Sequence, residues 1–143
     1  MEKTTKILVV DDDSGIGEML KTLLEFYGYE VDVTEKPLKA EELIQEKKID
    51  IVLLDMLISG VDGTDVCAGI RQNPEISETP VLMMSALHDA GPKCKKAGAN
   101  DFIAKPFEVE VLPKELKKYL QIKNSSIIFC EYGNNPINLT IIG

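Results

Sequence analysis

The residues with the clearest chemical potential follow short apolar runs of the sequence. Asp11 and Asp12 come directly after the first run, and Asp55 ends another. Ser85 and Lys105 follow two later runs. If these runs are parallel strands, their carboxyl ends meet at one edge of the sheet, which is where open α/β sheets bind ligands. The sequence therefore predicts three carboxylates, a hydroxyl and an ammonium in a single crevice.

Three converging carboxylates need a counter-charge. At ~4 Å, each pair repels by about 4 kcal/mol at an effective dielectric constant of 20, and Lys105 alone cannot offset this. Mg²⁺ prefers carboxylate oxygens, keeps several waters and accepts phosphate as a further ligand. With this ion the formal charge of the crevice is zero. We therefore predict an Mg²⁺ site beside a nucleophilic carboxylate, an arrangement suited to receiving a phosphoryl group.

The elements that position these residues alternate between β-prone runs and segments of helical periodicity, which is typical of βα units and a parallel sheet. The expected strands cover residues 7–10, 31–34, 49–54, 81–84 and 102–104. The first, third and fourth are apolar on both faces. Such strands are buried between two layers of helices.

The first expected helix has the clearest signals. Asp13 or Ser14 can cap its N-terminus, and Gly28 can end it. Its apolar face has helical spacing and consists of Ile16, Met19, Leu20, Leu23 and Leu24.

Prolines bound the other expected helices. A second helix should begin near Pro37, a third should stop before Pro74, and the last should start near Leu112. In the fourth position, residues 87–97, Gly91-Pro92 interrupts the helical pattern, so we expect a short or displaced helix that Gly98 ends.

Composition bounds the class of protein. The 143 residues carry a formal net charge of −8, with 44% hydrophobic and 28% charged residues. This is ordinary globular usage, and the acidity argues against direct binding to nucleic acid or to an anionic membrane. The three cysteines, with no signal peptide or membrane span in sight, favour free thiols in a cytoplasmic protein.

The chain changes character after residue 122. Residues 123–143 carry no net charge and contain two β-prone runs around a Gly-Asn-Asn-Pro cluster. We expect one domain over residues 1–122 and a possible β-hairpin tail over 123–143. Because this tail is apolar, our hypothesis is that it pairs with a sheet edge or with another chain, such as a second copy in a homodimer.

Five fragments in order resemble the receiver domain of bacterial two-component response regulators, from about residue 6 to about residue 121. They are Val9-Val10-Asp11-Asp12, Leu53-Leu54-Asp55, Asp62-Gly63, Pro80 through Ala86, and Ala97-Gly98-Ala99 through Lys105-Pro106-Phe107. The resemblance implies a flavodoxin-like α/β fold, a doubly wound parallel sheet of five strands in the order 2-1-3-4-5 with helices on both faces.

The resemblance also implies roles for the acidic residues. Asp55 would accept a phosphoryl group from the phosphohistidine of a sensor histidine kinase or of a histidine phosphotransfer protein. Asp12 and Asp55 would ligate Mg²⁺ directly, together with the backbone carbonyl of Leu57. Asp11 would act mainly through metal-bound water.

Three other residues would read out the phosphorylated state. Ser85 and Lys105 would bind the phosphoryl oxygens. Phe102 would be the aromatic switch residue, which turns inward when Ser85 moves toward the phosphate and so re-shapes a partner-binding face. Lys105-Pro106 resembles the cis peptide of the family, which orients the lysine.

The sequence departs from the family pattern in three places. Ser59 stands where proline is usual, and we expect it to loosen the loop slightly without touching the chemistry. The segment from Ser85 to Gly98 is shorter than usual. No output domain follows, which leaves open a stand-alone regulator, a phosphorelay intermediate, or the excised receiver of a longer transcription regulator or hybrid kinase.

Two competing functions fit the residues less well. An aspartate-nucleophile phosphatase of the haloacid-dehalogenase type needs a second acid two residues after the nucleophile, and Leu57 occupies that position. A protein that works by constitutive interaction alone would have lost Asp55 or Lys105. Leu57 and Leu87 should flank the path of water to an aspartyl phosphate, and neither can position that water, which predicts a long-lived phosphorylated state. His88 is interpreted as an ordinary solvated loop residue.

Overall fold

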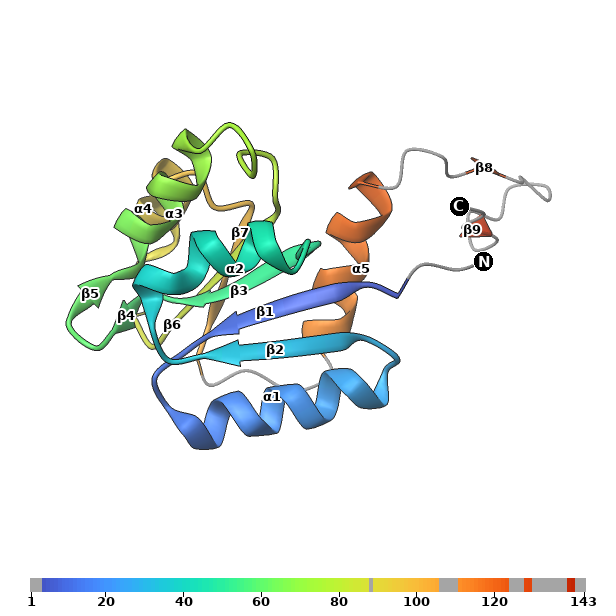
Figure 1. Cartoon of the computed structure of the whole chain (residues 1–143), viewed down its shortest axis with the longest axis horizontal. Helices are drawn as coiled ribbons and strands as arrows, with labels where there is room; N and C mark the ends of the chain where they lie inside the picture. The colour runs from blue at the N-terminus through green and yellow to red at the C-terminus, as the bar shows by residue number, and fades with distance from the viewer. Residues whose placement is uncertain (1–3, 88, 106–110, 124–127, 130–138, 141–143) are drawn as a thin grey trace.

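The computed structural model describes residues 4–87, 89–105 and 111–123, together with two short strands near the C-terminus. Its main sheet has five parallel strands in the hydrogen-bonded order β2-β1-β3-β6-β7, which is 2-1-3-4-5 when these five alone are numbered. This confirms the predicted fold (Figure 1). The strands are β1 (Lys6–Val10), β2 (Glu30–Thr34), β3 (Ile51–Asp55), β6 (Val81–Ser85) and β7 (Asp101–Ala104).

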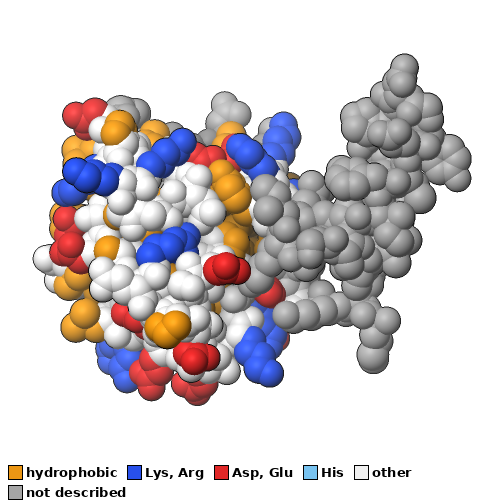
Figure 2. Space-filling view, turned by 90° about the horizontal axis from the view of Figure 1, so that it is seen from above, with side chains coloured by type: hydrophobic (Ala, Val, Ile, Leu, Met, Phe, Trp, Pro, Cys, Tyr) orange, Lys and Arg blue, Asp and Glu red, His pale blue; other side chains and the backbone are white. Residues whose placement is uncertain are grey.

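Helices cover both faces of this sheet. One face packs against α1 (Ser14–Phe26) and α5 (Val111–Lys123). The other packs against α2 (Ala40–Glu46), which a 3₁₀ turn (Pro37–Lys39) precedes, and against α3 (Gly63–Gln72) and α4 (Gly91–Lys96). Figure 2 shows acidic and basic side chains interspersed over the side that carries α2, α3 and α4 in Figure 1.

The central strands are apolar throughout because both of their faces are buried. On β1, Ile7 and Val9 join the core under α1 and α5, whereas Leu8 and Val10 join the core under α2, α3 and α4. Successive side chains of a strand point to opposite faces, so a strand between two helix layers has no position for a solvated residue. This burial fixes the sheet that carries the site.

The first helix follows its sequence signals closely. Oδ1 of Asp13 accepts hydrogen bonds from the backbone N–H groups of Gly15 and Ile16, at 3.0 and 3.2 Å, so the N-cap is Asp13 and Ser14 is the first helical residue. Gly28 follows the helix with a φ of +94°. Met19 differs from expectation: 47% of its surface is exposed, because it lies at the margin of the buried face.

The fourth helix is short, as predicted, but for a different local reason. Gly91-Pro92 does not interrupt the helix; it begins it, because the missing N–H of Pro92 is not needed in a first turn. Gly98 follows with a φ of +106°, a left-handed conformation that suits glycine. Residues 86, 87, 89 and 90, between Ser85 and this helix, belong to neither a helix nor a strand.

Two features around β3 differ from the prediction, the bounds of this strand and the element that follows it. The third parallel strand runs over Ile51–Asp55 and not over 49–54, because the N–H of Ile49 donates to the carbonyl of Ile44 at the end of α2. A small antiparallel pair, β4 (Leu57–Ile58) and β5 (Val61–Asp62), follows β3 and was not predicted.

Near the C-terminus, β8 (Ile128–Phe129) and β9 (Leu139–Thr140) pair antiparallel. Among the described residues they form a sheet of their own and do not extend an edge of the main sheet. The Gly-Asn-Asn-Pro cluster between them lies outside the described residues, and the domain boundary near residue 122 stays a prediction. None of the helices in the described part of the chain has the length and apolar character needed to cross a bilayer.

Candidate functional site

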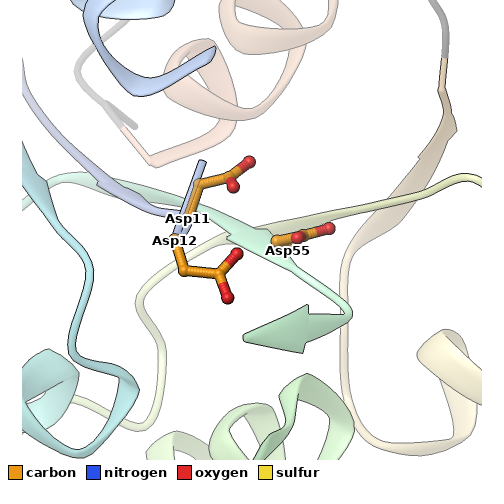
Figure 3. A group of neighbouring side chains, drawn as sticks. All are labelled: Asp11, Asp12 and Asp55. Carbon is orange, nitrogen blue, oxygen red and sulfur yellow. The ribbon is translucent and has the colours of Figure 1, made fainter. Parts of the chain in front are cut away.

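The predicted site residues lie together at the carboxyl edge of the main sheet. Asp11 follows β1, Asp55 and Ser85 end β3 and β6, and Lys105 follows β7. Together with Asp12, the two aspartates offer carboxylate oxygens that all lie within 4.8 Å of one another. Figure 3 shows the three aspartates at the point where β1 and β3 end side by side. This is the topological switch point of the sheet, because the next two strands in the sequence, β2 and β3, lie on opposite sides of β1.

Lys105 bridges two of the carboxylates. Its Nζ lies 3.0 Å from Oδ2 of Asp11 and 3.3 Å from Oδ1 of Asp55. Its backbone N–H donates to the carbonyl of Ser85 at 2.7 Å, which fixes the start of the lysine against β6. Burial lowers the pKa of Lys105, but the hydrogen bond to Asp11 and the charges of both aspartates outweigh burial and raise it. The ammonium is therefore charged at neutral pH.

Asp55 is partly desolvated. Only 15% of its side chain is exposed, and its Oδ1 accepts hydrogen bonds from the Lys105 ammonium and from the N–H of Met56, the latter at 3.0 Å. Burial raises its pKa; Lys105 lowers it and the charge of Asp11 raises it, and the net shift is upward. A bound cation would therefore stabilise the ionised form of the Asp55 carboxylate.

Asp11 is the most buried of the three aspartates, with 1% of its surface exposed. Its Oδ1 accepts a hydrogen bond from the N–H of Asp13 at 2.9 Å, and its Oδ2 accepts one from Lys105. Both oxygens therefore already have donors. Asp13 caps α1 and belongs to the fold rather than to the acidic cluster.

Asp12 is exposed and is held by a residue from the small hairpin. Its Oδ2 accepts a hydrogen bond from the backbone N–H of Ser59 at 2.7 Å and lies 3.4 Å from the Ser59 hydroxyl. Ser59, which was expected to affect only the loop, therefore contacts one of the predicted site residues, and its effect on the chemistry stays a prediction. Ser59 and Gly60 have φ values of +50° and +80°, the signature of a type I′ turn. Proline can supply neither this φ nor an N–H.

Ser85 is buried, and its Oγ accepts a hydrogen bond from the N–H of Leu87 at 3.0 Å. The hydroxyl is thus engaged with the loop that follows β6. Leu87 and Leu57 are 60% and 66% exposed at the rim of the site. Leu57 is the first residue of β4, two positions after Asp55; ligation by its carbonyl stays a prediction.

Phe102 is half-buried and packs against the core under α4. A Cβ added at Gly91 would lie 3.4 Å from Cδ1 of the Phe102 ring, so the ring rests against the first turn of α4. The aromatic switch role stays a prediction. His88 and Pro106, with the predicted cis peptide, lie outside the described residues.

Sequence reasoning missed two structural supports of the site. Gly63 begins α3 so close to β3 that an added Cβ would clash with the carbonyl oxygen of Asp55. Asp62 caps α3 by accepting a hydrogen bond from the N–H of Thr64 at 2.8 Å, and its Oδ2 pairs with Lys93 of α4 at 3.2 Å. The available signal was Asp62-Gly63 just after Ser59-Gly60, a capping residue after a tight turn.

The donor set fits a hard divalent cation. Mg²⁺ prefers oxygen ligands, is usually bound through one or two carboxylates and keeps several waters. One carboxylate oxygen from each of Asp11, Asp12 and Asp55 lies within 4.8 Å of the other two, a spacing compatible with direct and water-mediated contacts to one ion.

Comparisons with known proteins agree with this geometry. Residues 7–117 match the family described as the response regulator receiver domain. The phosphate regulon transcriptional regulatory protein PhoB of Rhizobium meliloti (strain 1021) is 33% identical over 118 residues, which cover 81% of this chain and 52% of that protein. The chain spans about half the length of the curated relatives that it matches.

Solved structures give the same answer. A putative response regulator from Chloroflexus aurantiacus J-10-fl is 36% identical, with a TM-score of 0.79, over 83% of this chain and 99% of that one. The receiver domain of the Pseudomonas aeruginosa sensor histidine kinase PA1611, with a magnesium ion coordinated in its active site cleft, is 25% identical, with a TM-score of 0.75, over 83% and 99%. The chain therefore belongs to the response regulator receiver domain family of two-component signalling.

Proposed function

We propose that this receiver is switched by phosphorylation of Asp55. The phosphoryl group would come from a phosphohistidine on a sensor histidine kinase or on a histidine phosphotransfer protein. A carboxylate oxygen of Asp55 attacks phosphorus, the P–N bond breaks, and the imidazole leaves with the electron pair and takes up a proton. The observation that carries this proposal is the position of Asp55 between an ammonium at 3.3 Å and two further carboxylates.

The acidic residues would hold Mg²⁺. Asp12 and Asp55 are the proposed direct protein ligands, with the carbonyl of Leu57. Asp11 is proposed to act through water, which is supported by the donors that already occupy both of its oxygens. The bound ion would neutralise charge on the incoming phosphoryl oxygens. Magnesium in the active site cleft of the similar PA1611 receiver supports this choice of ion.

Lys105 and Ser85 would receive the phosphoryl oxygens. The ammonium already lies beside Asp55, so it can transfer part of its hydrogen bonding to the phosphoryl group. The hydroxyl of Ser85 would first release the N–H of Leu87. A hydrogen bond of this kind contributes about 1 kcal/mol, a small cost beside a charge-assisted bond to phosphate.

The change at Ser85 would reach the surface through α4. Ser85 pairs with Ala104 across β6 and β7, and Phe102 lies two residues earlier on β7, with its ring against Gly91. A shift of the loop between Ser85 and α4 changes the space beside that ring. Phosphorylation would thereby bias a two-state equilibrium of the α4 and β7 face.

Labelling with acetyl phosphate tests this proposal. Wild-type protein should take up label only with Mg²⁺ present, and Asp55→Asn should take up none. Asp65→Asn is the matched control, because Asp65 is an exposed aspartate in the first turn of α3. Labelling of Asp55→Asn at the wild-type level, or no labelling of the wild type, would contradict the proposal.

A further inference from the structure

Ser59 holds the one exposed aspartate of the site. Its backbone N–H donates to Oδ2 of Asp12 at 2.7 Å, a short distance for a hydrogen bond to an ionised acceptor. We propose that Ser59 is a positioning residue that orients the Asp12 carboxylate for Mg²⁺ before the ion arrives. This inference rests on the Mg²⁺ site proposed above. It adds that Ser59 influences ion binding by orienting Asp12.

The conformation of Ser59 is unusual for its residue type. A φ of +50° is uncommon for residues other than glycine, asparagine and aspartate, and type I′ turns favour Asn-Gly over Ser-Gly. Strained backbone of this kind persists where the surroundings enforce it, often at functional sites. Here the left-handed turn is the conformation in which the N–H of residue 59 meets Asp12.

The base of the hairpin is anchored independently of Asp12. Asp62, which ends β5, accepts hydrogen bonds from the N–H and hydroxyl of Thr64, at 2.8 and 2.7 Å, and pairs with Lys93. Gly63 packs closely on the end of β3. The turn at Ser59 thus connects β4 and β5, and the end of β5 is held by contacts to α3 and α4.

Holding Asp12 in place opposes its repulsion from the other two carboxylates. An exposed carboxylate within 4.8 Å of two others gains by rotating away into water. Figure 3 shows its carboxylate turned away from that of Asp11. The Ser59 N–H uses one lone-pair direction of Oδ2, and a carboxylate has about four, so the hydrogen bond and an ion can share Asp12. Ordering one side chain in advance is expected to strengthen ion binding about two- to tenfold.

Substitutions at residue 59 test the inference. Ser59→Pro removes the N–H and forbids the φ, whereas Ser59→Gly and Ser59→Asn keep both. Calorimetric titration with Mg²⁺, without a phosphodonor, should show about two- to tenfold weaker binding for Ser59→Pro and wild-type binding for the two controls. Circular dichroism checks that each variant is folded. Equal or tighter binding by Ser59→Pro would overturn the inference.

The rate of labelling separates positioning from structural damage. With acetyl phosphate as donor, Ser59→Pro should need more Mg²⁺ for half-maximal labelling but reach the wild-type rate at saturating Mg²⁺. A lower rate at saturation would mean that the substitution damages the site as a whole, and it would overturn the positioning role. Failure of the wild type to bind Mg²⁺ would overturn the metal site itself, and the inference with it. Equal binding by wild type and Ser59→Pro would overturn the inference alone.

A measurement on unmodified Ser59 covers the case in which Ser59→Pro does not fold. In an amide NMR spectrum, the Ser59 resonance should move upfield in Asp12→Asn, because a neutral amide is a weaker acceptor than a carboxylate. It should keep its hydrogen-bonded position when wild-type protein is saturated with Mg²⁺. The inference would be overturned if the Ser59 amide chemical shift did not change in Asp12→Asn. It would also be overturned if addition of Mg²⁺ to the wild type moved that shift to the position of an amide without a hydrogen bond.

Discussion

Replacement of Lys105 by methionine should destabilise the fold and make its stability depend more strongly on Mg²⁺. Lys105→Met keeps an unbranched side chain of similar length but removes the ammonium from between Asp11 and Asp55. Only 18% of the Lys105 side chain, and 1% and 15% of the two acidic side chains, are exposed. The variant therefore leaves two largely buried carboxylates without their cation.

The size of the loss follows from the distances. At 3.0 and 3.3 Å, each attraction is about 5 kcal/mol at an effective dielectric constant of 20. Most of this offsets the cost of desolvating the lysine, and removing one partner of a buried pair typically costs about 3–5 kcal/mol. We expect the free energy of unfolding of Lys105→Met to fall by about 3 kcal/mol at neutral pH without Mg²⁺.

Urea unfolding at pH 7, with and without saturating Mg²⁺, measures this loss. The deficit of Lys105→Met should shrink when Mg²⁺ is present, because the ion supplies the positive charge that the variant lacks. Lys93→Met is the matched control: its ammonium lies 3.2 Å from Asp62, but the two side chains are 61% and 37% exposed. Such a pair contributes less than about 1 kcal/mol. A Lys105→Met variant as stable as Lys93→Met, or a deficit that Mg²⁺ does not change, would refute the electrostatic reasoning.

Three further predictions concern the acceptor, a distant hydrogen-bond network and the lifetime of the phosphorylated state. The pKa of Asp55 is raised in the folded state, so stability falls as pH rises from its unfolded pKa through its folded pKa; Asp55→Asn should be more stable than wild type at pH 7, with a gain that vanishes in acid. Arg71 donates four hydrogen bonds of 2.7–3.0 Å, two to the segment that precedes β6 and two to the segment that precedes β7. Arg71→Met should lower the free energy of unfolding by about 3 kcal/mol in urea, and Arg71→Lys should recover only part of this. Because neither Leu57 nor Leu87 can position the attacking water, the aspartyl phosphate should last for minutes or longer in a phosphate-release assay. Leu57→Gln should shorten that lifetime. Release within seconds from the wild type would contradict this prediction.

The position of the site could be predicted because the sheet determines it. Alternation of apolar runs and helical segments identified five parallel strands, and the polar residues after those strands then had to share one edge. The register of the strands was not needed for this step. The structure accordingly places Asp11, Asp12, Asp55, Ser85 and Lys105 at that edge.

The contacts within the site could not be predicted in the same way. The role of Ser59 depends on a left-handed turn that its residue type disfavours, so the residue type argues against the contact that is found. The hydroxyl of Ser85 is turned to a backbone N–H two residues later, a local alternative that serine offers in any loop. The start of α4 is set by the same Gly91-Pro92 pair that breaks the helical pattern in the sequence. In each case the tertiary surroundings selected one of several local conformations.

Chemical trapping of the acyl phosphate identifies the residue that carries the phosphoryl group. Borohydride reduces an aspartyl phosphate to homoserine, which peptide mass spectrometry assigns to a single position. After labelling with acetyl phosphate and Mg²⁺, we expect homoserine at position 55 and at neither of the other two aspartates of the site. Homoserine at Asp11 or Asp12, or none anywhere in labelled protein, would contradict this expectation.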